Sequence, residues 1–249
     1  MTKLLKLNFY ATPEHDCSYL PGQKSTTLFA DPEIKMDTGL YSQLSELGFR
    51  RSGQHYYRPH CELCQACTPI RIPAVNFKAS RSQKRILKKN ILIKSQVLPA
   101  DFHEDHYLLY EKYILHRHAD GDMYPPSREQ YRSFLVQGHT STQFVEFTIN
   151  QKLVCVAVMD HLNDGLSAIY TFFDPEFPEL SLGTYSILWQ IHETQRRHLN
   201  YLYLGYFVKA CQKMSYKNKF HPFEARISDQ WLTEKQLLKA ATTANSPAQ

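Results

Sequence analysis

The chain has 249 residues, of which 43% are hydrophobic and 13% aromatic, and its formal charge is +5. This composition is sufficient for a substantial core and argues against general disorder, so we expect one large globular unit or two small ones. No segment approaches about 18 consecutive apolar residues, and the first residues lack the apolar core of a signal peptide. Six cysteines without an export signal are typical of reduced thiols, which predicts a cytoplasmic protein.

The first hundred residues predict short, mixed elements. Leu40, Leu44 and Leu47 stand at helical spacing, with polar residues before them and Gly48 after them, so they predict a short amphipathic helix. The other elements expected here are an extended segment over 51–59, a loop over 60–67, a strand over 70–73, a helix over 80–90 and a strand over 91–98.

The rest of the chain predicts longer elements in a recognisable order. A helix is expected over 102–118, and a second one over 125–136 with Ser127 as its N-cap and Gln130 as the capping-box partner. Three strands joined by tight turns follow, then a long helix and a last strand: 142–149, 152–162, 166–173, 181–199 and 201–207.

A meander, a turn, a long helix and a further strand are the core of acetyltransferase-like folds. We therefore predict an α/β (α+β) fold with a mixed sheet of the GNAT type. In those folds the backbone amides of the turn before the long helix bind the acyl donor. The expected divisions are an N-terminal subdomain over 1–100 with the cysteine loop and a basic helix, an acetyltransferase-like domain over 101–240, and a disordered tail over 241–249.

Several catalytic motifs are missing from the sequence. It contains no G-x-x-x-x-G-K-[ST], no G-x-G-x-x-G, no G-x-S-x-G and no H-E-x-x-H. A P-loop ATPase and a dinucleotide-binding fold are therefore not supported. We expect a substrate that arrives already activated.

Three stretches carry a resemblance to a known family: "CSYLPGQKSTTLFAD" (17–31), the run 48–85 that contains "YRPHCELCQACTPIRI", and "IYTFFDPEFPELSLGTYSILWQI" (169–191) with "YLYLGYFVKACQKMSYKNKFHP" (201–222). Together they resemble the arginyl-tRNA–protein transferase family, and within it the compact bacterial leucyltransferase branch. The resemblance implies an aminoacyltransferase that moves leucine from leucyl-tRNA to the N-terminal Asp or Glu of proteins. The products are marked for degradation by the N-end rule.

Other readings of the same residues stay open. Within the enzyme class, arginine is the alternative donated residue. A non-catalytic RNA-binding module is the alternative from another class, but such a module has no need of the "SLGTYS" turn and the distal "GYFVKACQKMSYK" stretch. An acyl-CoA-dependent acetyltransferase is disfavoured, because the usual Q/R-x-x-G-x-G/A loop is missing.

The predicted reacting centre is the turn before the long helix. Free amides at Ser181, Leu182 and Gly183 are placed to hold an oxyanion or the terminal adenosine, and Tyr170 and Tyr185 to stack or donate hydrogen bonds. The plainer reading is a helix cap by Ser181 with two core tyrosines.

Basic residues are the candidates for recognising both substrates. A cation suits the side-chain carboxylate of the acceptor, and the candidates are Arg71, Arg81 and Lys213. The stretch 78–94 holds seven Lys or Arg and no acid, which suits the phosphates of tRNA. The tRNA candidates are Lys78, Arg81, Lys84, Arg85, Lys88 and Lys89, with Lys217 and Lys219 as weaker ones; the plainer reading is a solvated basic face.

The spacing C-x2-C-x2-C places three thiols in one loop. Cys61, Cys64 and Cys67, with Cys17 as a fourth ligand, suit Zn²⁺ or an iron–sulfur cluster, although the transfer itself requires no cofactor. Eukaryotic members of the family have been linked to an N-terminal iron–sulfur cluster, but this chain has Leu20 where the C-x2-C partner of Cys17 would stand. The alternative is a set of reduced thiols. The remaining candidates are His15, His55 and His60 as ligands, and Cys155 and Cys211 as core or pocket-lining thiols.

Overall fold

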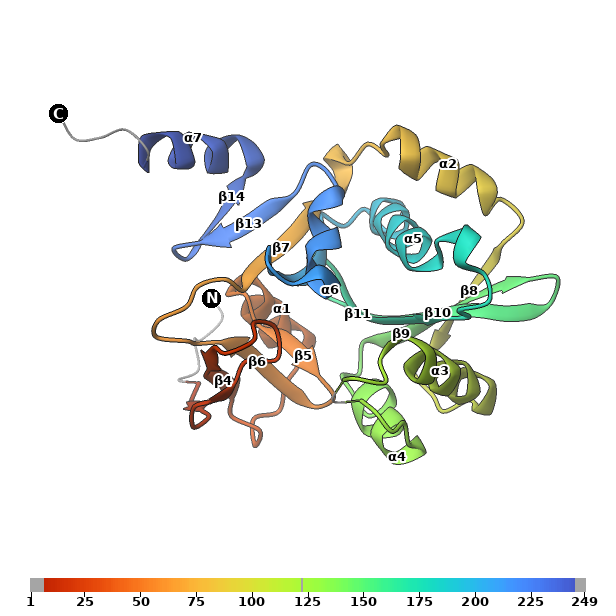
Figure 1. The fold of residues 1–249 in the computed structure, drawn as a ribbon, viewed down its shortest axis with the longest axis horizontal. Coiled ribbons are helices and arrows are strands. Elements are labelled where there is room, and N and C mark those ends of the chain that lie inside the picture. Colours follow the sequence, from red (N-terminus) through yellow and green to blue (C-terminus); the bar gives the residue numbers. More distant parts are fainter. Residues whose placement is uncertain (1–6, 122, 245–249) are drawn as a thin grey trace.

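The computed structural model describes residues 7–121 and 123–244 and has a mixed α+β fold built on one large sheet (Figure 1). Its eight strands run in the order β14-β13-β7-β12-β11-β10-β9-β8. The pair β11–β12 is parallel and the other neighbours are antiparallel. The strands are β7 (Thr68–Pro73), β8 (Lys94–Pro99), β9 (Thr142–Ile149), β10 (Lys152–His161), β11 (Gly165–Phe173), β12 (Tyr201–Phe207), β13 (Glu224–Ile227) and β14 (Gln230–Thr233).

Helices cover both faces of this sheet and form two core layers. On one face lies α5 (Leu182–Arg196) with α2 (Arg81–Lys89) beside it, and on the other lie α3 (Glu104–Arg117) and α4 (Arg128–Tyr131), which continues as a wider helical turn over Arg132–Val136 (Figure 1). Leu188 and Ile191 of α5 are buried in the first layer. Tyr110, Tyr131 and Phe172 are buried in the second. Burial of aromatic rings on this scale supplies much of the hydrophobic stabilisation.

The N-terminal part forms a smaller sheet that packs on one end of the large one. Its strands run in the order β1-β4-β6-β5, and a separate two-stranded ribbon joins β2 to β3. Tyr41, Leu44 and Phe49 share a core with Leu162 and Tyr203 of the large sheet. The elements are β1 (Phe9–Ala11), β2 (His15–Asp16), β3 (Lys24–Ser25), β4 (Thr27–Ala30), α1 (Thr38–Glu46), β5 (Arg50–Ser52) and β6 (His55–Pro59).

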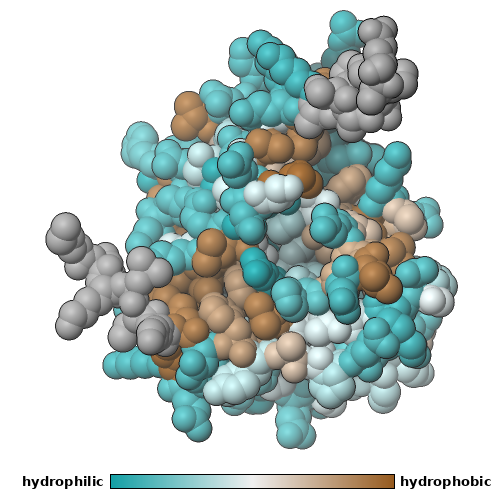
Figure 2. All heavy atoms as spheres, turned by 90° about the vertical axis from the view of Figure 1, so that its left-hand side faces the viewer, coloured by the Kyte–Doolittle hydropathy of each residue, from teal (hydrophilic) through white to brown (hydrophobic). Residues whose placement is uncertain are grey.

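The C-terminal part of the chain lies at one edge of the large sheet. After β12 come α6 (Gln212–Ser215), a 3₁₀ turn over Tyr216–Lys219, the hairpin β13–β14 and α7 (Glu234–Ala244). Figure 2 shows the face that carries these strands and the N-terminal sheet, where hydrophobic residues gather in patches among hydrophilic ones. Leu63 of the cysteine loop is 98% exposed. Among the residues described, no helix has the length and apolarity needed to cross a membrane.

The predicted N-cap at Ser127 is confirmed, and the helices expected around 40–47 and over 80–90 also begin at capping residues. Asp37, Ser80 and Ser127 each accept a backbone N–H at the start of a helix, and Ser80 with Gln83 completes a capping box. The expected extended segment over 51–59 is wrong in one respect: the chain turns back at Gly53, whose φ is +58°, so β5 and β6 form a hairpin.

The predicted division of the chain cuts through the large sheet. Strands β7 and β8 come from the first hundred residues, yet they pair with β12, β13 and β9 from the remainder. At the C-terminus α7 extends to Ala244, and residues 245–249 of the expected tail lie outside the described residues.

Candidate active site

The large sheet parts between its two parallel strands. Pairing between β11 and β12 stops after Ser167 and Tyr203, although the strands continue to Phe173 and Phe207. Each strand carries one extra residue at that point: Ile169 lies outside the register with β10, and Leu204 outside the register with β7. Extra residues of this kind bend a strand and are common beside active sites. The carboxyl ends of β11 and β12 therefore diverge beyond Ser167 and Tyr203, and we call this opening in the sheet the parting.

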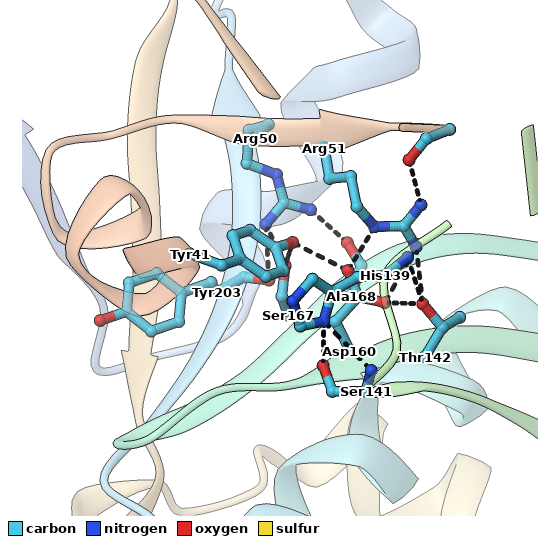
Figure 3. Close-up of polar contacts among 11 residues, drawn as sticks. Tyr41, Arg50, Arg51, His139, Ser141, Thr142, Asp160, Ser167, Ala168 and Tyr203 are labelled. Carbon is cyan, nitrogen blue, oxygen red and sulfur yellow. Dashed lines mark hydrogen bonds and ion pairs between the residues drawn. The ribbon is translucent and has the colours of Figure 1, made fainter. Parts of the chain in front are cut away.

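Arg50 of β5 lies at the point of divergence (Figure 3). Its guanidinium donates hydrogen bonds to the Ser167 hydroxyl over 2.8 Å, to the Tyr203 carbonyl over 3.4 Å and to the Ala168 carbonyl. These donors satisfy backbone acceptors that the missing strand pairing leaves free. Gly205, with φ of +81°, provides the room, because a Cβ there would lie 3.0 Å from Nε of Arg50.

Lys217 is a second basic group at the parting. Its side chain is buried, and Nζ lies 2.7 Å from the Tyr206 carbonyl and 3.2 Å from Sδ of Met214. Pro69, opposite Tyr206 on β7, has no N–H to offer to that carbonyl. Burial, reinforced by the positive charge of Arg50, lowers the pKa of Lys217 to about 7.

The N-terminus of α5 stands at the carboxyl end of β11. Ser181 is exposed, has φ of +51°, and its side chain caps no helical amide. A Cβ at Gly183 would lie 3.2 Å from the ring of Phe173, so the helix approaches the strand closely there. Leu182 and Tyr185 instead belong to the core layer under α5. Of these predicted residues, Ser181 and Gly183 therefore lie at the accessible end of the helix.

Tyr170 brings an unpartnered hydroxyl to the same region. Its ring packs against Tyr113 and Phe134 on the α3 face of the sheet, and its buried hydroxyl has no hydrogen-bond partner among the described residues. Burial raises the pKa of Tyr170, with smaller effects from neighbouring tyrosines that include Tyr216 of the C-terminal 3₁₀ turn. The hydroxyl therefore stays protonated at neutral pH, and it is available to donate a hydrogen bond.

The remaining family motifs converge on this end of the sheet. The Tyr206 hydroxyl donates to the backbone carbonyls of Gly48 over 2.9 Å and Tyr57 over 3.2 Å. Tyr19 interacts electrostatically with Tyr57 and with the thiols of Cys67, Cys17 and Cys211, and its pKa is raised mainly by burial. Stretches 17–31, 48–85 and 201–222 are thus brought together by folding. The sequence showed their residues but not their meeting point.

The cysteines gather near the parting without forming a metal cage. Burial, with smaller contributions from four neighbouring thiols, raises the pKa of Cys67 to about 12; these thiols are Cys17, Cys61, Cys64 and Cys211. Within 7–121 and 123–244, no three His, Cys, Asp or Glu side chains are placed to hold an ion. The thiols in this arrangement do not form a ligand set for Zn²⁺ or a cluster, and the metal site stays a prediction. Cys155 is fully buried in the core.

The histidines near the cysteines have other surroundings. His15 Nδ1 lies 3.1 Å from the carbonyl of Pro13, the ring of His55 packs edge-on against Phe29, and His60 is exposed. Their role as alternative ligands also stays a prediction.

The three acceptor candidates lie in different surroundings. Arg71 is buried between the rings of Tyr201 and Trp231, and its guanidinium pairs with Glu46 over 2.6 Å and Glu224 over 2.8 Å. It is therefore committed to two internal carboxylates, and binding a third would require breaking one of these pairs.

Lys213 and Arg81 are exposed. Lys213 pairs with Asp120 over 3.1 Å, and Arg81 begins α2. The structure does not bring the three candidates to one point, and sequence alone gave no sign that Arg71 is internally paired.

The predicted tRNA-binding residues do share one surface. The N-terminal half of α2 is anchored by Gln83, which is buried and donates to the Lys219 carbonyl over 3.1 Å, while Ile86 and Leu87 pack against the core. All six basic candidates are exposed to solvent: Lys78, Arg81, Lys84, Arg85, Lys88 and Lys89. Lys219 is exposed as well, whereas Lys217 is buried and cannot add to this surface.

An open groove of about 500 Å³ borders the start of α2. Lys78, His221 and Glu234 are among the residues that line it. It lies apart from the parting of β11 and β12, whose residues do not line it.

Comparison with known proteins decides the family. Two family models match the chain: the N terminus of arginine-tRNA-protein transferase over residues 15–85 and its C terminus over residues 105–227. The chain belongs to the arginine-tRNA-protein transferase family.

Named members of this family from bacteria are similar over nearly the whole chain. A protein of Marinobacter nauticus named aspartate/glutamate leucyltransferase is 54% identical over 231 residues, covering 93% of this chain and 98% of that protein. Proteins of the same name from Pseudomonas fluorescens and Hahella chejuensis are 51% and 49% identical, covering 93% and 94% of this chain and 99% and 100% of their own lengths.

Solved structures are only distantly similar. The C-terminal domain of a lysylphosphatidylglycerol synthetase from Agrobacterium fabrum gives a TM-score of 0.44 at 10% identity, covering 73% of this chain and 57% of that one. A second structure, L-PGS from Bacillus licheniformis, gives 0.43 at 8% identity, covering 67% and 49%.

Proposed function

We propose that this family member transfers leucine from leucyl-tRNA to the α-amine of proteins that begin with Asp or Glu, and so marks them for degradation by the N-end rule. The observation that carries the proposal is the end-to-end similarity, at about 50% identity, to relatives named for this activity. The meeting of the family motifs at one parting in the sheet supports a common site for them.

The chemistry needs little beyond alignment. The ester that joins leucine to the tRNA ribose is already activated, and an α-amine with a pKa of about 7.7–8.0 is partly neutral at pH 7. Its nitrogen attacks the ester carbonyl, a C–N bond forms, the C–O bond to the ribose breaks, and the proton lost from nitrogen ends on the ribose oxygen. Holding the two reactants together contributes up to about 7–11 kcal/mol in favourable cases.

Residues at the parting are suited to the negative oxygen that forms on the way. The predicted acetyltransferase-like arrangement gains support from the divergence of one parallel strand pair beside the N-terminus of a long helix. Amides around Gly183 and the unpartnered hydroxyl of Tyr170 are the donors we assign to the oxyanion or to the terminal adenosine.

The exposed basic surface of α2 is assigned to the tRNA. Six Lys and Arg side chains lie along α2 and just before it, and none of the six forms an ion pair with a carboxylate of residues 7–121 and 123–244. Free cations at this density suit phosphates. Recognition of the acceptor carboxylate falls to Arg81 or Lys213 more readily than to Arg71, which already has two partners.

The proposed metal site and the proposed location do not depend on the transfer reaction. Elemental analysis of anaerobically purified protein tests the cysteines: Zn or Fe in a fixed ratio to the chain would support a metal site, and neither metal would leave the cysteines as reduced thiols. A cytoplasmic location remains a prediction from cysteine usage.

Transfer is tested with two donors and matched acceptors. Purified protein receives radiolabelled leucyl-tRNA or arginyl-tRNA, with peptides that begin with Asp or Glu and differ from a control only by an N-terminal Asn. We expect label from leucyl-tRNA on the Asp and Glu peptides alone. Preference for arginyl-tRNA would establish arginine as the donated residue. If folded protein transfers neither amino acid, the proposed enzymatic function is wrong, and a non-catalytic RNA-binding module is the remaining alternative.

A further inference from the structure

Lys217 is a buried amine that no carboxylate neutralises among the described residues. It is 7% exposed, and its hydrogen-bond partners in that part of the chain are the carbonyl of Tyr206 and the sulfur of Met214. The charged or titratable groups facing it are Arg50 from β5, Cys67 ahead of β7 and Cys211 ahead of α6. A buried ammonium beside a guanidinium is costly, so this environment favours the neutral amine near pH 7.

Lys217 lies at the open end of the parting between β11 and β12. The 3₁₀ turn that holds Lys217 follows β12, just as the N-terminus of α5 follows β11, so both stand at the carboxyl ends of the diverging strands. Nζ also lies 5.9 Å from the ring centre of Tyr216, which interacts with Tyr170 and its unpartnered hydroxyl. The amine of Lys217 and the hydroxyl of Tyr170 therefore each interact with Tyr216.

We propose that Lys217 is a catalytic residue that relays the proton during aminoacyl transfer. The inference rests on the proposed function and adds a residue to it. The neutral Nζ accepts the proton that the α-amine loses as its nitrogen bonds to the ester carbonyl. The ammonium so formed then donates that proton to the ribose oxygen as the C–O bond breaks, and Lys217 returns to its neutral form. No other reactant is consumed.

The other titratable groups nearby are less suited to the relay. The guanidinium of Arg50 is a hydrogen-bond donor and not a base. Cys67 holds its proton because its pKa is about 12. Lys213 is exposed and paired with Asp120, and His118 is engaged with the Tyr113 hydroxyl over 3.2 Å. A general base is most effective when its pKa lies near the working pH, which is the condition that burial gives Lys217.

The test compares Lys217→Met, Lys217→Arg and the exposed control Lys35→Met. Methionine keeps the length and apolar bulk of the side chain. Arginine keeps the positive charge and N–H donors, but it cannot act as a base. Single-turnover transfer from radiolabelled leucyl-tRNA to a saturating Asp peptide is followed from pH 6 to 9, alongside leucyl-tRNA affinity and the thermal midpoint of each variant.

We expect wild type and Lys35→Met to show a rate that rises with pH through a limb near 7, where Lys217 loses its proton, besides the limb of the acceptor amine. Both Lys217 variants should lose the first limb, with rates about 10²–10⁴-fold lower and unchanged tRNA affinity.

Two results would overturn the relay. The first is a wild-type rate and pH profile in Lys217→Arg, which would mean that only the hydrogen bond matters. The second is a loss of folding or tRNA binding in both variants that accounts for the lost rate, which would mean a structural role. Absence of transfer by the wild type is a different result and counts against the proposed function itself.

Discussion

Arg50 and Arg51 are neighbours in the sequence and differ in what surrounds them (Figure 3). The side chain of Arg51 is fully buried and pairs with the fully buried Asp160 over 2.6 and 2.9 Å, with further hydrogen bonds to the Gly53 carbonyl and the Thr142 hydroxyl. Arg50 is half-buried and donates to carbonyls and a hydroxyl, and it pairs with no carboxylate of the described chain.

The difference separates a structural use of arginine from a functional one. The Arg51–Asp160 pair joins the N-terminal sheet to β10 and leaves no charge for a ligand. Arg50 and Lys217 place two basic groups, without counter-ions among the described residues, where the sheet opens. Under the proposed function, the positive charge of Arg50 lies where it suits the negative charge that develops during acyl transfer. The same strand thus contributes to both the fold and the site.

Removal of one partner of the Arg51–Asp160 pair is expected to have the largest effect on stability. Arg51→Met or Asp160→Asn leaves a buried group without its partner, so either should lower the free energy of unfolding by about 3–5 kcal/mol in urea titrations. Arg50→Met should cost less, about 1–3 kcal/mol, because it leaves carbonyls and not a charge unsatisfied, yet it should lower transfer more. Equal effects of Arg50 and Arg51 on both measurements would remove the distinction.

A pair of glycine variants tests whether the position of Arg50 matters. Gly205 and Gly22 both have positive φ, at +81° and +74°, so an alanine at either strains the backbone by about 1–2 kcal/mol. An added Cβ meets Arg50 at position 205, whereas at position 22 nothing lies within 4 Å. Gly205→Ala should therefore reduce transfer and Gly22→Ala should not. If both variants transfer alike at equal folded fraction, displacement of Arg50 has no catalytic consequence.

Charge reversal on α2 extends the comparison to the surface. The double variant Lys84→Glu, Arg85→Glu should weaken leucyl-tRNA binding and reduce the slope of log affinity against log salt by about one for each phosphate that α2 no longer neutralises. Thermal stability should not fall, because both side chains are exposed. Lys35→Glu, an exposed change on the N-terminal part, is the control. A slope that stays at the wild-type value would move the tRNA site away from α2.

The smallest effect on stability is expected at two carboxylates, Asp164 and Asp174. The first has a neighbouring carboxylate that raises its pKa, and the second has neighbouring lysines that lower its pKa. Burial, with a further contribution from Glu46, raises the pKa of Asp164, so the stability it contributes is present in acid and is lost as pH rises through that pKa. Burial opposes ionisation of Asp174 too, but Lys112 and Lys152 outweigh it and lower its pKa, so its contribution is lost as pH falls.

The corresponding asparagine variants should differ in sign. Asp164→Asn is expected to hold or gain stability at neutral pH, and Asp174→Asn to lose it, with both approaching the wild type in acid. Urea midpoints between pH 3 and 8 measure this. Loss of stability at neutral pH in both variants would mean that hydrogen bonding, not charge, controls both sites.

Much of the fold was predictable because local signals marked it. The caps at Asp37, Ser80 and Ser127 and the turns at residues 150–151 and 163–165 fixed the elements they bound. Strands β1 to β4 and the β13–β14 hairpin were not predicted. Each of these strands is only two to four residues long and shows no clear alternation of apolar and polar residues. Short strands of this kind are stabilised by their neighbours in space.

The candidate site was predictable in part. The turn at Ser181–Gly183, Tyr170 and the basic helix were predicted from motif and spacing, and their roles stay predictions. The pairing of Arg71 with Glu46 and Glu224 was not foreseen, because those residues are 25 and 153 positions away in the chain. Lys217 was first considered as a surface charge, and only its burial gives it another role.

By itself the sequence determined the order of elements, the family and the basic face of α2, because helical and strand periodicity, caps and motifs depend on residues close together in the chain. The parting of β11 from β12, the basic side chains that occupy it and the burial that shifts the pKa of Lys217 were decided by tertiary structure alone. Electrostatic environment is set by what lies within a few ångströms in space, and here those neighbours come from segments up to about 170 residues apart.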